Sequence, residues 1–336
     1  MSSAGFFPEN TKLDNSSPIL VTGGAGFIGS SLVECLLENG FKVRCFDNFS
    51  TGFRRNIEPF FQSPDFELLE GDLRNIDDCR AAVKDVKYIF HEAALGSVPR
   101  SIADPATSIA VNTAGTVNLF DAARSAGVKR IVYASSSSVY GDDKSSEKKE
   151  EITGQVLSPY AASKVTCELF AANFALVYGL EFVGLRYFNV FGKRQDPDGA
   201  YAAVIPKFAK QLLDHQSPTI NGDGTISRDF TFVGNVVCAN ILAMAVPEAA
   251  GKVFNVGCGR SFDLNELFAR LRDALAEFDP EIAKIEAVHG APRQGDILYS
   301  LASIERAENI LGYQPRYTFE EGIALTAKYY ADSQKN

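Results

Sequence analysis

Residues 18–30 read Pro-Ile-Leu-Val-Thr-Gly-Gly-Ala-Gly-Phe-Ile-Gly-Ser, and this stretch decides how the rest of the chain is interpreted. Its first part is a short apolar run, typical of a strand buried on both faces. Glycines follow, and from Phe27 onward apolar residues recur at helical spacing. Strand, glycine turn and helix in this order predict a dinucleotide-binding turn, because absent side chains let backbone N–H groups reach a pyrophosphate at the helix N-terminus.

The glycines fit two registers of that motif. Gly24, Gly26 and Gly29 match G-x-G-x-x-G, whereas Gly23, Gly26 and Gly29 match G-x-x-G-x-x-G. The motif alone also fits a glycine-rich turn without a ligand. The next strand ends at Asp47, roughly twenty residues beyond the glycines, where an acidic side chain bonds a ribose hydroxyl. An acid there favours NAD over NADP, because a 2′-phosphate would meet a carboxylate.

Composition excludes several classes of function. The 336 residues carry a net charge of −9, which argues against nucleic acid as a partner. No apolar run is long enough to span a membrane, and the first residues lack a signal-peptide pattern, so a cytoplasmic location is expected. Residues 1–17 are expected to be a frayed tail. The cysteines lack C-x-x-C spacing and read as buried free thiols, and the histidines offer no metal-ligand spacing.

Apolar runs and helical patterns alternate through the first half of the chain. Residues 105–126 predict one long helix, with Asp104 as its N-cap and Gly127 as its stop. This alternation predicts an α/β fold built on a Rossmann-type, doubly wound parallel sheet, whose ligands bind beyond the carboxyl ends of the strands. In addition to the strand before the glycines and the strand that ends at Asp47, further strands are expected at 66–69, 88–91 and 130–134.

Several polar or small residues follow the expected strands at those ends. The loop 48–52 is expected to wrap an adenosine. Asp72 either reaches an adenine amino group or caps the helix that follows it. Ala93 lets the backbone approach a cofactor, whereas His91 reads as a core histidine. Asn112 lies on a helix face that either supports the cofactor loops or is simply polar.

A serine cluster and a Tyr-x-x-x-Lys pair are the candidates for catalysis. Four serines, 135–138, follow the fifth expected strand. They are therefore expected at the carboxyl end of the sheet, where ligands bind. In the long helix expected at 159–178, Tyr160 and Lys164 stand at i, i+4 and share a face. A Lys ammonium one turn away, with an oxidised nicotinamide, would stabilise the phenolate and make the tyrosine a base. Alone, the pair also fits an ordinary helix with a surface Lys and a packed Tyr.

Together these residues resemble the extended short-chain dehydrogenase/reductase family, over nearly all of residues 18–330. The resemblance rests on residues 22–29, on the serine-tipped strand with Val-Tyr-Gly at 139–141, and on the Tyr-x-x-x-Lys pair. It implies that Tyr160 is the catalytic base, that Ser136 is its serine partner, and that Lys164 binds the nicotinamide ribose. The cofactor-binding residues predicted in this way are Gly23, Gly26, Phe27, Ile28, Gly29, Asp47, Asn48, Ser50, Thr51, Gly52, Asp72, Leu73, Ala93, Ser135, Tyr160, Lys164 and Tyr187.

The second half resembles the nucleotide-sugar branch of that family. Residues 185–192 resemble the strand and turn whose Asn holds the sugar phosphate, and 222–230 and 293–296 resemble segments that bind the UDP moiety. Two separated arginines suit a diphosphate, because each presents bidentate donors, although each alone also fits a surface ion pair. The residues concerned are Asn189, Arg228, Arg293 and Asp296.

The resemblance favours C4 epimerisation over the other reactions of this branch. Dehydratases and decarboxylases carry an acid just after the catalytic serine, where Ser137 and Ser138 stand in this chain. Tyr160 would take the 4-hydroxyl proton while C4 passes a hydride to NAD, and the 4-keto sugar would turn over before the hydride returns. Because NAD is regenerated in each turnover, it is expected to stay tightly bound.

The expected substrate is UDP-N-acetylglucosamine, converted to UDP-N-acetylgalactosamine. Ser300 matches the position that gates the C2 substituent in UDP-hexose 4-epimerases, where Tyr excludes N-acetyl groups and a small residue admits them. Residues 95–101 also match the subgroup that prefers N-acetylated sugars. UDP-glucose, UDP-hexuronates and a non-catalytic dinucleotide sensor remain alternatives. The predicted substrate-binding residues are Gly96, Ser97, Ser136, Ser137, Tyr160, Asn189, Gln195, Ala203, Arg228, Arg293, Asp296 and Ser300.

The chain is expected to form two domains and to assemble as a homodimer. In the family, the helices that correspond to 105–126 and 159–178 pair across a two-fold axis, so a homodimer through a four-helix bundle is expected. The charged stretch 142–157 reads as a loop with no recognisable ligand. The NAD-binding domain would comprise 1–188 with a return segment at 230–257, and a smaller α/β lobe for the nucleotide sugar would comprise 189–229 and 258–336.

Overall fold

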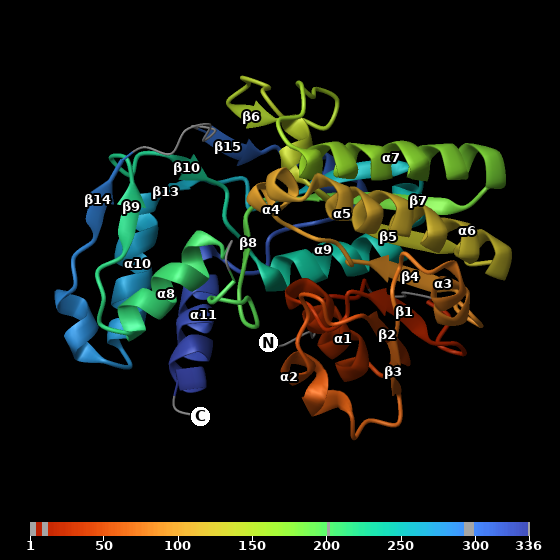
Figure 1. Cartoon of the computed structure of the whole chain (residues 1–336), viewed down its shortest axis with the longest axis horizontal. Helices are drawn as coiled ribbons and strands as arrows, with labels where there is room; N and C mark the ends of the chain where they lie inside the picture. Colours follow the sequence, from red (N-terminus) through yellow and green to blue (C-terminus); the bar gives the residue numbers. More distant parts are fainter. Residues whose placement is uncertain (1–4, 9–12, 200–201, 292–298, 335–336) are drawn as a thin grey trace.

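A seven-stranded sheet lies at the centre of the computed structural model, which describes residues 5–8, 13–199, 202–291 and 299–334. Its strands follow the order β12-β7-β5-β4-β1-β2-β3, and all neighbouring strands pair in parallel. This order confirms the doubly wound α/β fold (Figure 1). The strands are β1 (Ile19–Thr22), β2 (Val43–Asp47), β3 (Phe66–Glu70), β4 (Tyr88–His91), β5 (Arg130–Ser136), β7 (Glu181–Tyr187) and β12 (Lys252–Val256).

Helices bury both faces of this sheet. They are α1 (Phe27–Glu38), α3 (Ile76–Ala82), α6 (Thr116–Ala126), α7 (Pro159–Tyr178) and α9 (Val233–Ala245). Ile19 and Val21 of β1 lie in the core formed with α1 and α9, whereas Leu20 lies in the core formed with α3, α6 and α7. Because the central strands β1, β4 and β5 are covered on both faces, they appear in the sequence as short continuous apolar runs.

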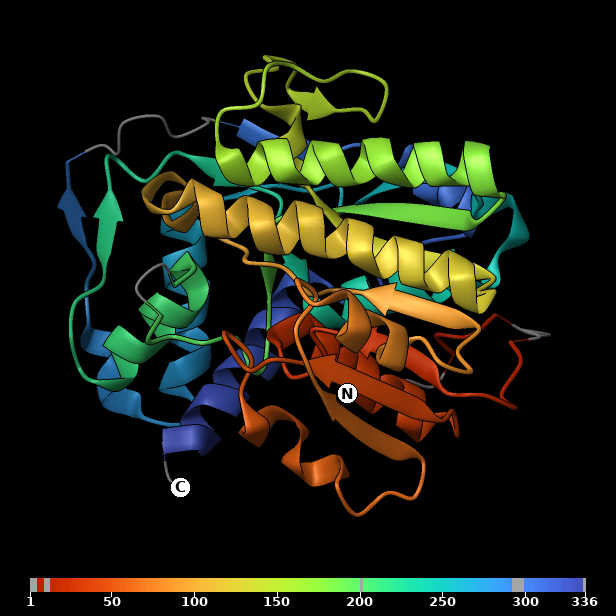
Figure 2. The same ribbon diagram turned by 45° about the vertical axis from the view of Figure 1, so that its right-hand side comes forward.

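The helix expected at 105–126 is present but contains a π-helical stretch. It consists of α5 (Pro105–Ile109), η2 (Ala110–Gly115) and α6, with η2 in the π form. Asp104 caps its start by accepting a hydrogen bond from the Thr107 N–H at 3.0 Å, and Gly127 ends it at a φ of 71°. This helix runs beside α7 along one side of the sheet (Figure 2).

A smaller lobe is formed mainly by segments that follow β7, and the chain reaches it from β7 through β8 (Figure 1). Its main sheet follows the order β13-β10-β15-β6, and β8 pairs separately with β11. The rings of Phe262 and Phe319 stack in its core, with centroids 4.1 Å apart. Its elements are β6 (Glu147–Lys148), β8 (Val190–Phe191), β10 (Ser227–Arg228), β11 (Thr231–Phe232), β13 (Phe262–Asp263), β15 (Tyr299–Ala302), α8 (Val204–Leu213), α10 (Leu264–Ala276) and α11 (Phe319–Gln334), and β9 (Thr219–Asn221) pairs with β14 (Val288–Gly290).

The charged stretch 142–157 is more ordered than its composition suggests. It contains β6, which pairs in parallel with β15. Lys148 is buried, and its ammonium donates a hydrogen bond to the Asp143 carboxylate at 3.0 Å. Glu150 accepts a hydrogen bond from the backbone N–H of Asn255 at 2.8 Å. The stretch is the expected loop except for the two residues of β6, and the sequence did not indicate that two of its charged side chains, Lys148 and Glu150, have partners in the fold.

The N-terminal segment also packs on the domain. Phe6 is 3% exposed, and the ring of Phe7 stacks on Phe41 with centroids 5.1 Å apart. The frayed tail predicted for 1–17 is therefore wrong for its described parts, 5–8 and 13–17. All six cysteines are free, as predicted, and only Cys258 is not fully buried. Among the helices of the described ranges, none has the length and apolar character needed to cross a membrane.

Candidate active site

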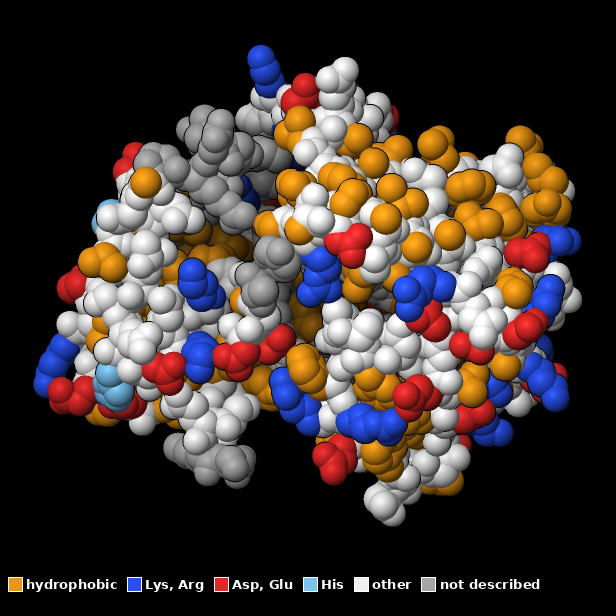
Figure 3. Space-filling view, in the orientation of Figure 1, with side chains coloured by type: hydrophobic (Ala, Val, Ile, Leu, Met, Phe, Trp, Pro, Cys, Tyr) orange, Lys and Arg blue, Asp and Glu red, His pale blue; other side chains and the backbone are white. Residues whose placement is uncertain are grey.

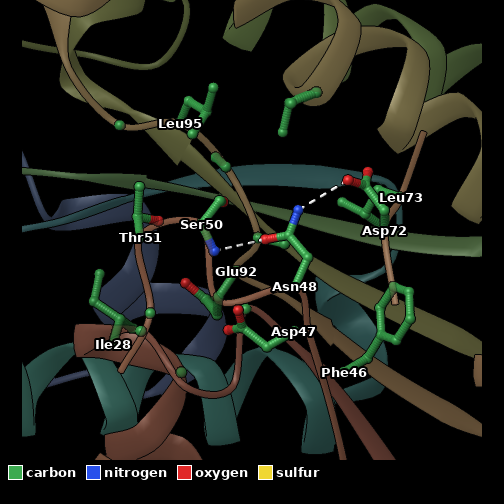
Figure 4. Close-up of a pocket in the computed structure, with 18 of the residues that line it drawn as sticks. Ile28, Phe46, Asp47, Asn48, Ser50, Thr51, Asp72, Leu73, Glu92 and Leu95 are labelled. Atoms are coloured by element: carbon green, nitrogen blue, oxygen red, sulfur yellow. Dashed lines mark hydrogen bonds between the residues drawn. The ribbon is translucent and has the colours of Figure 1, made fainter. Parts of the chain in front are cut away.

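A cavity of about 340 Å³ opens where β1, β2, β3 and β4 end. The glycine turn borders it, and side chains from the first turn of α1, from the loop after β2 and from the ends of β3 and β4 converge on it (Figure 4). The predicted residues that line it are Gly23, Gly26, Phe27, Ile28, Gly29, Asp47, Asn48, Ser50, Thr51, Gly52, Asp72, Leu73, Ala93 and Gly96. The other predicted cofactor residues, Ser135, Tyr160, Lys164 and Tyr187, belong to the neighbouring β5, α7 and β7.

The glycine geometry decides between the two registers. Gly23 has a φ of +67°, and a Cβ there would lie 2.7 Å from the Ala93 nitrogen. A Cβ on Gly29 would lie 2.1 Å from the carbonyl oxygen of Gly23. Gly24 instead faces the sheet, where a Cβ would lie 2.5 Å from the Cys45 sulfur. The register that lines the cavity is therefore Gly23, Gly26 and Gly29, and the first turn of α1 behind it has no side-chain cap.

Asp47 ends β2 at the edge of the cavity. Its carboxylate accepts hydrogen bonds from the N–H of Ala25, at 2.9 Å, and from the N–H of Phe49, at 2.8 Å. Burial raises the pKa of this carboxyl, and the two N–H donors oppose that shift. The guanidinium of Arg44 bonds Glu67 at 2.8 Å. Arg44 is thus held elsewhere, and the carboxylate stands at the place where a 2′-phosphate would lie in NADP.

Asp72 is held by neighbours on the cavity rim. Asn48 donates to its carboxylate at 2.9 Å (Figure 4). Arg74 donates to the same carboxylate through Nε and Nη2 at 3.0 and 2.6 Å. The hydrogen bonds from Arg74 hold the pKa of Asp72 well below its usual range. Asn75, and not Asp72, caps α3 by accepting from the Asp77 N–H. Of the two interpretations of Asp72, the helix cap is therefore wrong.

Glu92 is a cavity residue that the sequence analysis missed. It follows β4 and accepts a hydrogen bond from the Tyr187 hydroxyl at 2.8 Å. Asn240 of α9 donates to the same hydroxyl at 2.8 Å. Burial raises the pKa of Glu92 to about 7, although the Tyr187 hydroxyl and the Lys164 charge oppose the shift. A carboxyl that titrates near neutral pH therefore lines the cavity.

His91 and Asn112 support the cavity from behind. The two ring nitrogens of His91 bond the hydroxyls of Thr22 and Thr116 at 2.7 and 2.9 Å, and burial lowers its pKa to about 3. His91 is therefore the core histidine that was predicted. Asn112, in the π-helical stretch, accepts from the Leu95 N–H at 2.8 Å and donates to the Leu95 carbonyl at 3.2 Å. Asn112 thus holds the loop that lines the cavity, which agrees with the interpretation that its helix face supports the cofactor loops.

Tyr160 and Lys164 lie at the tip of β5. The Lys164 ammonium is 5.9 Å from the centroid of the Tyr160 ring and donates to the Ala134 carbonyl at 2.7 Å. The backbone N–H of Tyr160 bonds the Ser101 hydroxyl at 3.1 Å. Ser136 ends β5 and accepts a hydrogen bond from the Ser138 N–H at 3.1 Å. The three predicted catalytic residues thus come from two adjoining elements, α7 and β5.

Ser135 has a partner that the sequence did not suggest. Its hydroxyl donates to the Glu168 carboxylate at 2.5 Å. The same carboxylate accepts two hydrogen bonds from Arg186, at 2.9 and 2.8 Å, and Arg186 stands opposite Ser135 in the pairing of β5 with β7. Because Glu168 is one turn beyond Lys164 on α7, its bonds to Ser135 and Arg186 tie α7 to the ends of β5 and β7.

The predicted substrate residues that the structure describes belong to elements or loops of both the large-sheet part and the smaller lobe. The surface is hollowed between these two parts (Figure 3). Arg228 and Ser300 are partners in the parallel pairing of β10 with β15. Asn189 lies between β7 and β8 at a φ of 30°, and Gln195 donates to the Val190 carbonyl at 3.2 Å. Ser97 caps α4 (Val98–Ala103), Ser137 begins η3 (Ser137–Tyr140), and Ala203 precedes α8. Arg293 and Asp296 lie outside the described residues.

The shape and chemistry of the cavity fit a dinucleotide. The first turn of α1 has no side-chain cap and borders the cavity at Gly26, Phe27 and Gly29, which is the place where a pyrophosphate binds at a helix N-terminus. Asp47 supplies an acceptor suited to a ribose hydroxyl. The residues present would therefore hold NAD, with its diphosphate at the first turn of α1 and its adenosine toward Asp47 and Asp72.

Known proteins share this architecture along almost the whole chain. The UDP-glucose 4-epimerase of Mycolicibacterium smegmatis is 38% identical over 319 residues, which are 94% of this chain and 99% of that protein. A solved UDP-N-acetylglucosamine 4-epimerase from Methanobrevibacter ruminantium, in complex with UDP-N-acetylmuramic acid, is 39% identical with a TM-score of 0.88, covering 95% of this chain and 100% of that one. The UDP-glucose 4-epimerase of Thermus thermophilus, solved with NAD, is 34% identical with a TM-score of 0.81, covering 93% and 98%.

A family model describes the part of the chain that carries the large sheet. The model of the NAD dependent epimerase/dehydratase family matches residues 19–257, from the first residue of β1 to the residue after β12. The matched segment includes the glycine turn, Asp47, and the Tyr160–Lys164 pair. This chain therefore belongs to the NAD dependent epimerase/dehydratase family, and its cofactor is NAD.

Proposed function

We propose that this protein is a UDP-sugar 4-epimerase that interconverts UDP-N-acetylglucosamine and UDP-N-acetylgalactosamine. The observation that carries the proposal is the Lys164 ammonium, held between the ring of Tyr160 and the tip of β5. Full-length relatives that bear 4-epimerase names support the reaction class.

Epimerisation is favoured over dehydration because no carboxyl follows the catalytic serine. Ser137 and Ser138 occupy those positions at the start of η3. Nearby carboxyls have other partners, since Glu168 pairs with Arg186 and Glu92 bonds Tyr187. Expulsion of water from the sugar needs a free acid, whereas epimerisation at C4 needs a base, its support and an anchored nucleotide.

The residues of the chain divide the work of proton transfer. Bound NAD supplies a hydride acceptor and donor for C4 of the sugar. Tyr160 takes the proton of the 4-hydroxyl group and gives it back, and the Ser136 hydroxyl shares that proton by hydrogen bonding. Lys164 keeps a positive charge beside the phenolate, and its bond to Ala134 fixes that charge in place. Arg228, with Arg293, would hold the diphosphate.

The sugar preference follows from Ser300. Its small side chain would leave room for an acetamido group on C2, and its pairing with Arg228 would bring it close to the diphosphate. The remaining predicted substrate residues, among them Gly96, Gln195 and Ala203, are proposed to contact the sugar. UDP-glucose is the second candidate, because two full-length relatives are named for it.

We also propose two domains and a homodimer. The proposed division is 1–188 with 230–257 for NAD, and 189–229 with 258–336 for the nucleotide sugar. Two short strands, β6 and β11, come from the first set of segments but pair with β15 and β8 of the smaller lobe. On α7, Leu169 is 64% and Leu176 85% exposed, and apolar side chains gather over this side of the molecule (Figure 3). Because the two leucines stand seven residues apart on one helix face, they suit a helix–helix contact between two copies.

Product analysis tests the proposed function. The purified protein would be incubated with UDP-N-acetylglucosamine, UDP-glucose and UDP-N-acetylglucuronate in separate reactions, without added NAD. We expect UDP-N-acetylgalactosamine to form at the highest rate. Absence of any C4 epimer in all three reactions would contradict the proposal, and a faster reaction of UDP-glucose would contradict the sugar preference.

A further inference from the structure

Asp229 is a fully buried carboxylate at the junction of the two parts of the molecule. It accepts hydrogen bonds from the N–H of Cys258 at 2.8 Å, of Gly259 at 3.0 Å and of Ala302 at 3.4 Å. Burial raises its pKa to about 6, and these N–H donors oppose the shift. A buried charge is stable only when such donors compensate it, so the two segments that donate, 258–259 and the end of β15 at Ala302, are held around one side chain.

The backbone of Asp229 binds two predicted substrate residues. Its N–H donates to the Ser300 carbonyl at 2.8 Å, and its carbonyl accepts from the Asn189 side chain at 3.0 Å. Arg228 precedes it in the chain and pairs with Ser300. Residues that are more than 100 positions apart in sequence, Asn189 and Ser300, therefore meet at one residue.

We propose that Asp229 is a positioning residue that sets Arg228, Asn189 and Ser300 in register on the nucleotide side of the site. The inference rests on the proposed function, because it assumes that these three residues bind a UDP-sugar. The carboxylate joins the loop after β12 to β15, and the backbone joins β15 to the end of β7. Loss of the carboxylate acceptors would let β15, and with it Ser300, shift relative to Arg228.

Gly257 supplies a second way to disturb the same contact. A Cβ on Gly257 would lie 2.7 Å from the Asp229 carboxylate and 2.6 Å from the Ala302 Cβ. Its backbone φ lies outside the left-handed region, so alanine adds bulk at this point without backbone strain. Gly257→Ala therefore displaces the carboxylate from the opposite side and leaves its charge intact.

The test compares UDP binding with catalysis in the NAD-loaded protein. Calorimetric titration with UDP, bound NAD after extraction, and kcat and KM for UDP-N-acetylglucosamine would be measured for wild type, Asp229→Asn and Gly257→Ala. We expect the Kd for UDP and the KM to rise by roughly ten- to a hundredfold, the range that loss of one hydrogen bond to a charged group gives. Bound NAD and kcat at saturation should stay within about twofold of wild type.

Asp263→Ala is the control for general loss of stability. Asp263 caps α10 in the same lobe by accepting from the Glu266 N–H, so its loss should lower the unfolding temperature without weakening UDP binding. If Asp229→Asn does not fold, Gly257→Ala carries the same comparison. Unchanged UDP affinity in the variants, or equal weakening in Asp263→Ala, overturns the inference alone. A wild-type protein that binds no UDP overturns the proposed function and this inference together.

Discussion

The Lys164 ammonium lies 5.9 Å from the centroid of the Tyr160 ring while it donates to the Ala134 carbonyl at 2.7 Å. Helix α7 and strand β5 therefore hold the proposed base and its supporting charge in fixed relation. Tyr160→Phe should lower kcat by roughly a hundred- to ten-thousandfold, because the proton acceptor is lost while the ring still packs. Tyr178→Phe on the same helix is the matched control and should retain activity in the same product assay. Full activity of Tyr160→Phe would exclude this tyrosine as the base.

Gly26→Ala should separate folding from cofactor binding. A Cβ on Gly26 would come no closer than 3.1 Å to another atom, the Gly23 carbonyl oxygen, so the turn can accommodate it. The same Cβ would enter the cavity where the diphosphate is expected. We expect thermal unfolding near that of wild type and a large loss of extractable NAD. Gly29→Ala, with a contact of 2.1 Å, should lose stability as well. Retention of NAD by Gly26→Ala would place the diphosphate elsewhere.

Ser300→Tyr should change the sugar preference. A large ring at this position would fill the space that the C2 acetamido group needs. We expect turnover of UDP-N-acetylglucosamine to be lost and turnover of UDP-glucose to remain. Ser300→Ala keeps the side chain small and should preserve both activities. Unchanged turnover of the acetylated sugar by Ser300→Tyr would remove Ser300 as the gate.

Glu92 should make stability depend on pH near neutrality. Its pKa rises from an ordinary 4.5 to about 7 in the folded protein, so the folded state binds this proton more strongly than the unfolded state. Stability from this group is therefore lost as pH rises through about 7. Denaturant titration would give the free energy of unfolding of wild type and of Glu92→Gln. The value for Glu92→Gln should rise relative to that of wild type as the pH increases from about 5 to 8.

Tyr187→Phe tests the cause of that dependence. It removes the hydroxyl that donates to Glu92, a bond that opposes the upward shift in pKa. The pH at which stability falls should therefore move upward in this variant. A difference between Glu92→Gln and wild type that does not vary with pH would show that Glu92 has the same charge in both states.

Leu176→Glu should dissociate the proposed homodimer. Leu176 is 85% exposed on α7, and a charge in a helix–helix contact would be buried without a partner. Size-exclusion chromatography with light scattering should give a dimer for wild type and a monomer for the variant. Leu325→Glu, at a leucine 40% exposed on α11, is the control and should remain dimeric. A monomeric wild type would contradict the proposal.

The local parts of the fold were predictable from sequence. Short-range sequence spacing was enough to predict three of them: the strand before Gly23, the acid at Asp47 and the helix 159–178. The Tyr160–Lys164 pair could be found for the same reason, because helical geometry fixes the relation of residues four apart. The cavity residues up to Ala93 follow from one rule, that the carboxyl ends of parallel strands meet at one edge of the sheet.

The missed features all depend on partners far along the chain. Glu92 gains its role from Tyr187, and Glu168 from Ser135 and Arg186. The sequence suggests that Lys148 is a surface charge. It is buried in the structure because β6 pairs with β15, which lies more than 150 residues further along the chain. Local spacing gives no information on such contacts, so the charge pattern predicted the loop at 142–157 without β6 or the burial of Lys148.

Isotope retention tests the central claim most directly. UDP-N-acetylglucosamine that carries deuterium at C4 would be converted by the purified protein in ordinary water without added NAD, and the product examined by mass spectrometry and proton NMR. If the hydrogen leaves C4 as a hydride and returns from the bound cofactor, UDP-N-acetylgalactosamine should keep its deuterium at C4. Replacement of that deuterium by solvent hydrogen would contradict the account.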